Sequence, residues 1–190
     1  MYDAGIEKPG TMGALIGLNP DAVDEICRNL SEEGVIQPAN YNSPGQVAIS
    51  GEIPIIRKAL EKAREAGAKK AVELEVSGAF HSPLMEHAQS GLAEAINKAT
   101  IHNVSIPLYS NVTSKPVTES NQIKDLLFKQ LTSPVLWQNS MENMIRDGFE
   151  TFYEIGPGKV LKGLLKRIDR SVNCTEIGTV EALQNRGVTL

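Results

Sequence analysis

The stretch Val76-Ser77-Gly78-Ala79-Phe80-His81-Ser82-Pro83-Leu84-Met85 decides the fold, because it joins a predicted strand over residues 71–76 to a predicted helix. Ser82 followed by Pro83 is typical of a helix start: serine caps the first turn, and proline needs no N–H partner there. His81 therefore lies between strand and helix, where side chains of α/β enzymes meet substrate. Imidazole exchanges a proton near neutral pH. His81 is thus a candidate general base; the alternative is a structural histidine bonded to a backbone carbonyl.

The residues before this stretch alternate between strand and helix patterns. Strands are predicted over residues 11–18, 35–40, 46–50 and 71–76, with a turn over residues 42–45. Amphipathic helices are predicted from Pro20 to Leu30 and over residues 53–66, ended by glycines. The resulting order βαββαβ over residues 11–76 predicts a ferredoxin-like α+β subdomain. Residues 1–10 are interpreted as the remnant of a preceding helix or linker.

A different pattern follows over residues 77–190. Helices are predicted over residues 84–99, 123–131, 137–146 and 160–168, and strands over residues 104–109 and 151–155. Alternating strands and helices indicate an α/β domain with a parallel sheet and covering helices. The last fifteen residues are polar, and we expect them to form a loose tail.

Composition excludes several classes of protein. The 190 residues carry a net charge of −4, which argues against nucleic acid as the main partner, since phosphate binding needs a basic face. No apolar run is long enough to span a membrane and the N-terminus lacks a secretory pattern, so a cytoplasmic location is expected. Cys27 and Cys174 are expected to be free thiols, and no His/Cys cluster predicts a metal site.

Four strings, in the same order, resemble one family. They are the histidine stretch quoted above, Asn40-Tyr41-Asn42-Ser43-Pro44-Gly45-Gln46-Val47, Tyr109-Ser110-Asn111-Val112-Thr113, and Glu154-Ile155-Gly156-Pro157-Gly158-Lys159-Val160-Leu161. Together they resemble the malonyl-CoA:acyl carrier protein transacylases and the related acyltransferase domains of polyketide and fatty acid synthases. The resemblance extends over nearly the whole chain.

The resemblance implies a fold, a reaction and two site residues. Residues 77–190 would be the C-terminal part of an α/β-hydrolase-like domain. The reaction would move malonyl from malonyl-CoA to the phosphopantetheine thiol of acyl carrier protein, without a bound cofactor. His81 would be general base and acid, and the backbone carbonyl of Gln130 would orient it. Phe80, directly before the histidine, would favour malonyl over branched acyl groups.

The same resemblance exposes a difference. Family members carry a Gly-His-Ser-Leu-Gly nucleophile elbow, a Gly-Gln-Gly-Ser segment and an arginine for the malonyl carboxylate, all upstream of the matching strings. Neither the elbow nor the Gly-Gln-Gly-Ser segment occurs here, and no Gly-x-Ser-x-Gly is present. We therefore expect the chain to be a C-terminal portion that is inactive alone, poorly stable, and open at its sheet edges and apolar helix faces.

Other residues leave two readings open. Asn111 either orients the turn around the pocket or closes an Asx turn, and for Asn40 and Asn42 a turn role is favoured over substrate contact. Gly156-Pro157-Gly158-Lys159 lacks the Walker spacing and is interpreted as a tight strand-to-helix turn. The basic side chains near it form either a solvated face or a docking face for the acidic carrier; they are Lys159, Lys162, Lys166, Arg167 and Arg170. His87 and His102 are expected at the surface.

Two other functions remain as alternatives to the fatty acid transacylase. One is a fragment without catalytic activity that binds a carrier or another partner. The other is the acyltransferase domain of a polyketide synthase. Activity separates the first alternative from the enzyme, and the second differs in its acyl specificity.

Overall fold

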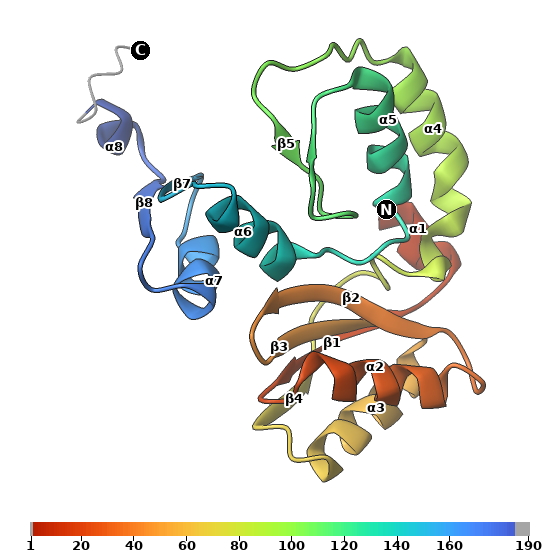
Figure 1. The fold of residues 1–190 in the computed structure, drawn as a ribbon. Helices are drawn as coiled ribbons and strands as arrows, with labels where there is room; N and C mark the ends of the chain where they lie inside the picture. Colours follow the sequence, from red (N-terminus) through yellow and green to blue (C-terminus); the bar gives the residue numbers. More distant parts are fainter. Residues whose placement is uncertain (1, 185–190) are drawn as a thin grey trace.

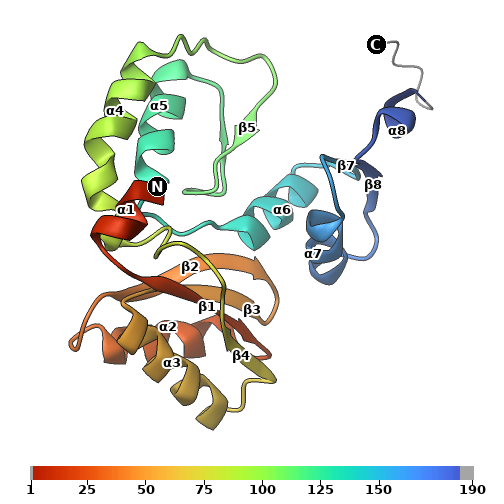
Figure 2. The ribbon, with the colours of Figure 1, turned by 180° about the vertical axis from the view of Figure 1, so that it is seen from behind.

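A four-stranded sheet and two helices form the first part of the computed structural model, which describes residues 2–184 (Figure 1). The strand order is β2-β3-β1-β4, and all three pairings are antiparallel. Both helices cover one face of the sheet (Figure 2). In chain order the elements are β1 (Thr11–Ile16), α2 (Pro20–Leu30), β2 (Ile36–Ser43), β3 (Gln46–Gly51), α3 (Ile53–Glu65) and β4 (Lys70–Glu73). The βαββαβ order predicted from the sequence is confirmed, whereas the domain boundary at residue 76 stays a prediction.

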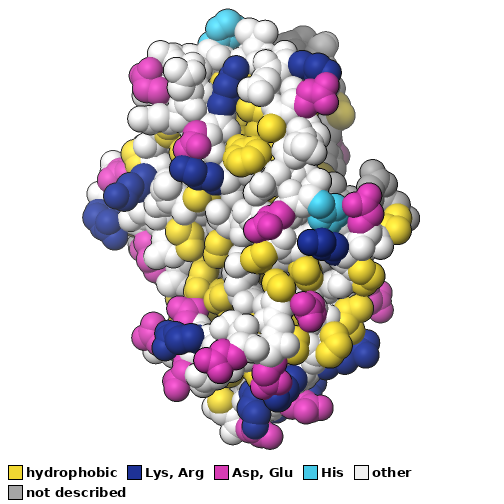
Figure 3. Space-filling view, turned by 90° about the vertical axis from the view of Figure 1, so that its right-hand side faces the viewer, with side chains coloured by type: hydrophobic (Ala, Val, Ile, Leu, Met, Phe, Trp, Pro, Cys, Tyr) yellow, Lys and Arg dark blue, Asp and Glu magenta, His cyan; other side chains and the backbone are white. Residues whose placement is uncertain are grey.

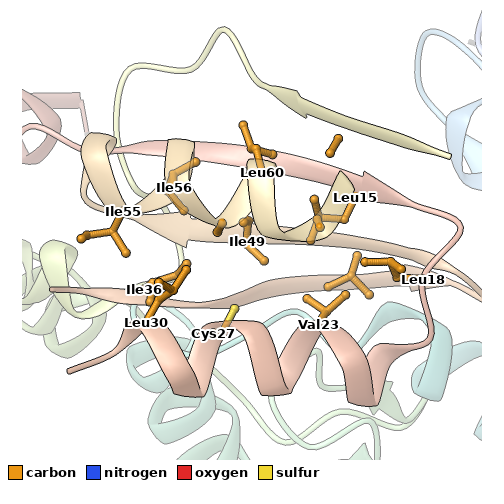
Figure 4. Packing of buried hydrophobic residues seen from close by; sticks show 14 residues of the cluster. Leu15, Leu18, Val23, Cys27, Leu30, Ile36, Ile49, Ile55, Ile56 and Leu60 are labelled. Atoms are coloured by element: carbon orange, nitrogen blue, oxygen red, sulfur yellow. The ribbon is translucent and has the colours of Figure 1, made fainter. Parts of the chain in front are cut away.

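The main core lies between this sheet and its helices (Figure 4). Alternate residues of a strand point to opposite faces, so Val47 and Ile49 of β3 face the helices together. The helices contribute core residues at helical spacing, among them Val23 of α2 and Ile56 of α3, which are both fully buried. Asn19 caps α2, because its side-chain oxygen accepts a hydrogen bond from the backbone N–H of Asp21.

Three predicted strand boundaries in this part are wrong. Strand β1 ends at Ile16 instead of residue 18. Strand β2 continues to Ser43, so Asn40 and Asn42 lie in a strand and the turn contracts to Pro44-Gly45, where Gly45 has φ 69°. Strand β4 ends at Glu73 instead of residue 76. There the chain leaves the sheet, and the Val76 N–H donates to the Leu74 carbonyl in a tight turn.

The opposite face of the sheet supports the histidine stretch. Met12, Ala39 and Ala48 are buried on that face and pack with half-buried side chains of the connecting segment, including Val76 and Phe80. Burying this apolar surface holds the segment before His81 against the sheet. The small subdomain therefore positions the candidate base.

The remaining elements form separate small units (Figure 1). They are the 3₁₀ helix η1 (Pro83–Ala88), α4 (Gln89–Lys98), β5 (Leu108–Tyr109), β6 (Pro116–Val117), α5 (Ser120–Lys129), α6 (Trp137–Arg146), β7 (Thr151–Ile155), α7 (Val160–Ile168), β8 (Asn173–Ile177) and α8 (Val180–Gln184). The single helix predicted over residues 84–99 is thus divided in two. The expected loose tail is wrong as far as Gln184, because the last two residues of β8 and the whole of α8 lie within it.

The predicted parallel sheet is reduced to one parallel pair, β7 with β8. Strand β5 has two residues and pairs with β6 in antiparallel orientation, where a strand over residues 104–109 was expected. Within residues 2–184 no further strand joins β5 to β7. A parallel strand needs a neighbour from a distant part of the sequence, and the described residues do not supply one.

Helix α1 (Tyr2–Glu7) packs beside η1, and the interpretation of residues 1–10 as the remnant of a preceding helix or linker stays a prediction. Gly5 also lets α1 lie against the segment before His81, because a Cβ atom there would lie 2.0 Å from the carbonyl oxygen of Ser77. His87 of η1 was predicted at the surface, but this packing covers most of its side chain. Its side chain is 21% exposed, with Nε2 3.7 Å from the Glu7 carboxylate.

Large apolar side chains are exposed on the second part of the chain. Ile106 is 80% exposed, Ile155 of β7 is 77% exposed and Val160 of α7 is 71% exposed. The exposure of Val160 and Leu161 agrees with the expectation that apolar helix faces of this chain are open. The face that carries α4 and α5 shows hydrophobic side chains between charged ones of both signs (Figure 3). No helix within residues 2–184 is long and apolar enough to cross a membrane.

Candidate active site

His81 sits at the start of η1 with an unusual backbone. Its φ of 58° is in the left-handed region, which residues other than glycine rarely adopt. The next residue fixes the turn: the Ser82 hydroxyl donates to the Ala79 carbonyl at 2.6 Å and accepts from the Leu84 N–H at 3.3 Å. Ser82 is fully buried and caps η1, as the sequence predicts. These bonds hold the His81 side chain at the lip of the helix.

The structure brings His81 and Gln130 together. His81 Nδ1 lies 3.0 Å from the backbone carbonyl oxygen of Gln130. A carbonyl can only accept a hydrogen bond, so in the neutral ring Nδ1 carries the proton and Nε2 keeps its lone pair. The arrangement leaves Nε2 able to accept a proton from a substrate or nucleophile.

The Gln130 carbonyl can accept a hydrogen bond from His81 because it lies at the end of a helix. Gln130 is the C-cap of α5, and the last carbonyls of a helix have no partner within it. The Gln130 side chain is half-buried, and its Nε2 donates to the Ser133 carbonyl at 2.9 Å. This bond fixes the end of α5 beside the imidazole.

Asn111 lies in the same neighbourhood, in the turn after β5. Its backbone carbonyl accepts from the Leu136 N–H at 2.8 Å, and the hydroxyl of Ser110 closes the turn by accepting from the Val112 N–H. The turn therefore uses Ser110 where an Asx turn by Asn111 was the alternative. Asn111 and Gln130 line one pocket of about 240 Å³; its other lining residues are Leu108, Tyr109, Ser110, Ile123, Leu126 and Leu127.

No nucleophile completes the arrangement within residues 2–184. Ser82 is nearest in sequence, but its hydroxyl is buried and already donates to Ala79. Ser77 and Ser90 are exposed, and no serine hydroxyl of the described chain hydrogen-bonds to the His81 ring. The site as it stands provides a base and its orienting carbonyl.

Comparison with known proteins identifies the family to which the chain with this His81–Gln130 contact belongs. The model of the acyl transferase domain matches residues 4–186. The chain belongs to the acyl transferase domain family. The resemblance inferred from four short strings is thus confirmed.

The relatives of this acyl transferase domain are longer proteins. Malonyl CoA-acyl carrier protein transacylase of Staphylococcus aureus (strain MSSA476) is 44% identical over 173 residues, which are 90% of this chain and 56% of that protein. An acyl-carrier-protein-S-malonyltransferase from Bartonella henselae superposes with a TM-score of 0.89 at 40% identity, over 95% of this chain and 59% of that one. A type II PKS acyl-carrier protein in complex with its malonyl-transacylase matches with a TM-score of 0.91 at 33% identity, over 97% and 60%. The chain spans little more than half the length of these relatives.

The basic residues predicted to dock the carrier lie on and beside α7. Lys159, Lys166 and Arg167 are exposed, whereas Lys162 is half-buried and its Nζ lies 3.1 Å from the Glu176 carboxylate of β8. The hydrogen bond from Lys162 lowers the pKa of the Glu176 carboxyl, and the carboxylate in turn partly neutralises the charge of Lys162. Of the five predicted docking residues, Lys159, Lys166, Arg167 and Arg170 are exposed.

The turn before α7 is closed to an external anion. The Glu154 carboxylate accepts hydrogen bonds from the backbone N–H groups of Leu161 and Lys162 at 3.0 and 2.8 Å. An acidic side chain thus occupies donors that a phosphate would need at a helix N-terminus. Gly156 and Gly158 have φ of 129° and 96°, which explains glycine at both positions. The reading as a tight turn is supported.

The other candidate residues have structural positions. Cys27 is buried in the main core, where burial raises the pKa of its thiol to about 12, and Cys174 is also a free thiol. His102 is exposed, as predicted. Within residues 2–184 no group of three or more His, Cys, Asp or Glu could hold a metal ion.

One residue at the site gave no signal in the sequence. Gln37 of β2 donates from its side-chain amide to the His81 carbonyl and to the Thr132 carbonyl. Both partners are backbone atoms, which leave no pattern of residue types.

Proposed function

We propose that this chain is part of an enzyme that transfers malonyl from malonyl-CoA to the phosphopantetheine thiol of acyl carrier protein. The observation that carries the proposal is the 3.0 Å contact between His81 Nδ1 and the Gln130 carbonyl, on a chain of the acyl transferase family. Relatives of the chain are named malonyl CoA-acyl carrier protein transacylase and acyl-carrier-protein-S-malonyltransferase, and one malonyl-transacylase is solved in complex with its acyl-carrier protein. Cytoplasmic location stays a prediction from the sequence.

In the first half of the proposed reaction the nucleophile is a serine. We place this serine in the additional part that the longer relatives have. Its hydroxyl proton passes to His81 Nε2 while its oxygen attacks the malonyl thioester carbonyl. The C–S bond then breaks, and the coenzyme A thiolate takes the proton from the imidazolium. The Gln130 carbonyl keeps Nδ1–H oriented and stabilises the charged ring.

In the second half, the carrier thiol gives its proton to Nε2, and its sulfur attacks the malonyl ester. The ester C–O bond breaks, and the serine oxygen recovers the proton from the imidazolium. No oxidant, metal or cofactor is needed for either half.

The α/β-hydrolase-like body is part of the same proposal. The exposed side chains of Ile155 in β7 and Val160 in α7, and the two-residue strand β5, support this part of the proposal. We infer that the additional part found in longer relatives packs against these surfaces. This would place a serine near His81 and bury the apolar side chains together.

The test of the proposed function is transfer of malonyl from malonyl-CoA to a holo carrier, with the protein purified whole from its native host. A mass gain of one malonyl group on the carrier is expected. A protein that binds the carrier but transfers nothing would contradict the enzyme and favour the binding fragment.

The polyketide alternative has one observation in its favour, the match to a polyketide transacylase complex at a TM-score of 0.91. Phe80 does not separate the two pathways, since it would restrict the acyl group and not the carrier. Comparing kcat/KM for fatty acid and polyketide carriers separates them. We expect the fatty acid carrier to be preferred.

Reversal of two charges on α7 is expected to weaken carrier docking. The double variant Lys162→Glu/Lys166→Glu should raise the carrier KM about tenfold with little change in kcat, because acidic carriers are attracted by basic surfaces. The matched control is Lys58→Glu/Lys62→Glu on α3, which has the same spacing and also removes lysines paired with carboxylates. Equal KM values for the two double variants would remove α7 from the docking surface.

A further inference from the structure

The backbone of His81 needs support from outside its own loop. With φ of 58° it occupies a region that is disfavoured for a residue with a Cβ atom. Such a conformation persists only where surrounding contacts over-determine it. One contact bears on it directly: Gln37 Nε2 donates to the His81 carbonyl oxygen at 2.5 Å.

The same amide group holds the segment that orients the ring. Gln37 Nε2 also donates to the Thr132 carbonyl at 2.9 Å, two residues after Gln130. An amide NH₂ has two protons, so it can satisfy both carbonyls at once. Gln37 thus bridges the two backbone segments whose separation sets the distance from His81 Nδ1 to the Gln130 carbonyl.

The backbone around Gln37 makes an independent connection. Val135 pairs with the edge of β2: its N–H donates to the Ala39 carbonyl at 2.7 Å, and its carbonyl accepts from the Tyr41 N–H at 2.9 Å. These bonds dock residues 132–136 on β2 without the Gln37 side chain. Losing that side chain should therefore disturb the His81 geometry while the strand contact and the core remain.

We propose that Gln37 is a positioning residue that fixes the His81–Gln130 contact and thereby the tautomer of the base. The inference rests on the proposed function for its kinetic consequence, but its structural consequence can be measured without any transfer. Neither ring nitrogen contacts Gln37, so its effect passes entirely through the backbones of His81 and Thr132.

The test uses the whole protein labelled with ¹⁵N-histidine, and its readout is the ¹⁵N chemical shifts of the neutral imidazole. The His81 signals are those absent from His81→Ala. Wild-type His81 should carry its proton on Nδ1, held by the Gln130 carbonyl. In Gln37→Met, which keeps the length and loses the donors, part of the population should move to the Nε2–H form that imidazole prefers in water.

A second variant and a control make the result decisive. Gln37→Glu keeps the shape but sets a carboxylate against two carbonyls, so a larger tautomer shift is expected. Gln46→Met makes the same substitution in the neighbouring strand, where the side chain accepts from the Ser43 hydroxyl, and should leave His81 unchanged. Unchanged backbone amide spectra of β1 and β3 show that a variant is folded.

Kinetics complete the test. In the active protein, Gln37→Met should lower kcat by about 10- to 100-fold with KM little changed, because a small misplacement of the base acts on the chemical step. A folded Gln37→Met with the wild-type tautomer, or with a shifted tautomer and wild-type kcat, overturns the proposal. If the wild-type protein transfers no malonyl, the proposed function fails, and the tautomer measurement alone decides whether Gln37 positions His81.

Discussion

Replacing His81 by alanine should lower kcat for malonyl transfer by about 10³-fold, which is within the range expected for removing a general base. The imidazole accepts the proton of the nucleophile and returns it to the leaving thiolate, so both halves of the reaction lose their proton carrier. Malonyl-CoA and the carrier should still bind, since the substitution removes a single side chain that does not line the pocket beside Gln130. The measurement is steady-state transfer to a holo carrier by the whole protein.

The control for this variant is His102→Ala. His102 is exposed, in the segment between α4 and β5. Its replacement should leave kcat and KM at wild-type values. A His81→Ala enzyme with kcat within threefold of wild type would show that another group is the base.

Replacing Ile56 by alanine is expected to lower the free energy of unfolding by about 3 kcal/mol, because the substitution leaves a cavity in a packed core. Ile56 has no exposed surface and lies between α3 and the sheet, close to Ile49 and Leu60 (Figure 4). This core holds the surface on which the His81 segment rests. Urea unfolding followed by circular dichroism gives the value.

Ile155→Ala is the matched control in the described chain, because the same side chain is 77% exposed there. Its effect on the 190-residue chain should stay within about 0.5 kcal/mol. In the longer protein, where we propose that this surface is covered, the same substitution should cost more. Equal effects of Ile56→Ala and Ile155→Ala in the 190-residue chain would contradict the description of the core.

The sequence predicted the first part of the fold because that part is self-contained. Alternation in β3 and helical spacing in α2 and α3 report which residues face a common core, and all partners lie within residues 11–73. The second part was predicted less well: β5 has two residues where a longer strand was predicted, and Val160 of α7 is 71% exposed. Periodicity predicts an apolar face but not whether it is covered.

The candidate site was only partly predictable, for a different reason. His81 is marked by its side chain and by Ser82-Pro83 after it, so the residues themselves indicate a candidate. Gln130 contributes a main-chain oxygen, which any residue could provide, and was found only through the family resemblance. Gln37 binds two carbonyls from a strand that is distant in sequence. Only the three-dimensional arrangement brings it to the site.

The central claim is that His81 serves a serine nucleophile located in another part of the protein. The most direct test is peptide mapping of the protein from its native host after brief incubation with malonyl-CoA. The account predicts one malonyl ester, on a serine outside these 190 residues, which holo carrier removes and which forms far more slowly in His81→Ala. A malonyl group on a residue of this chain, or an ester that forms equally fast without His81, would contradict the account.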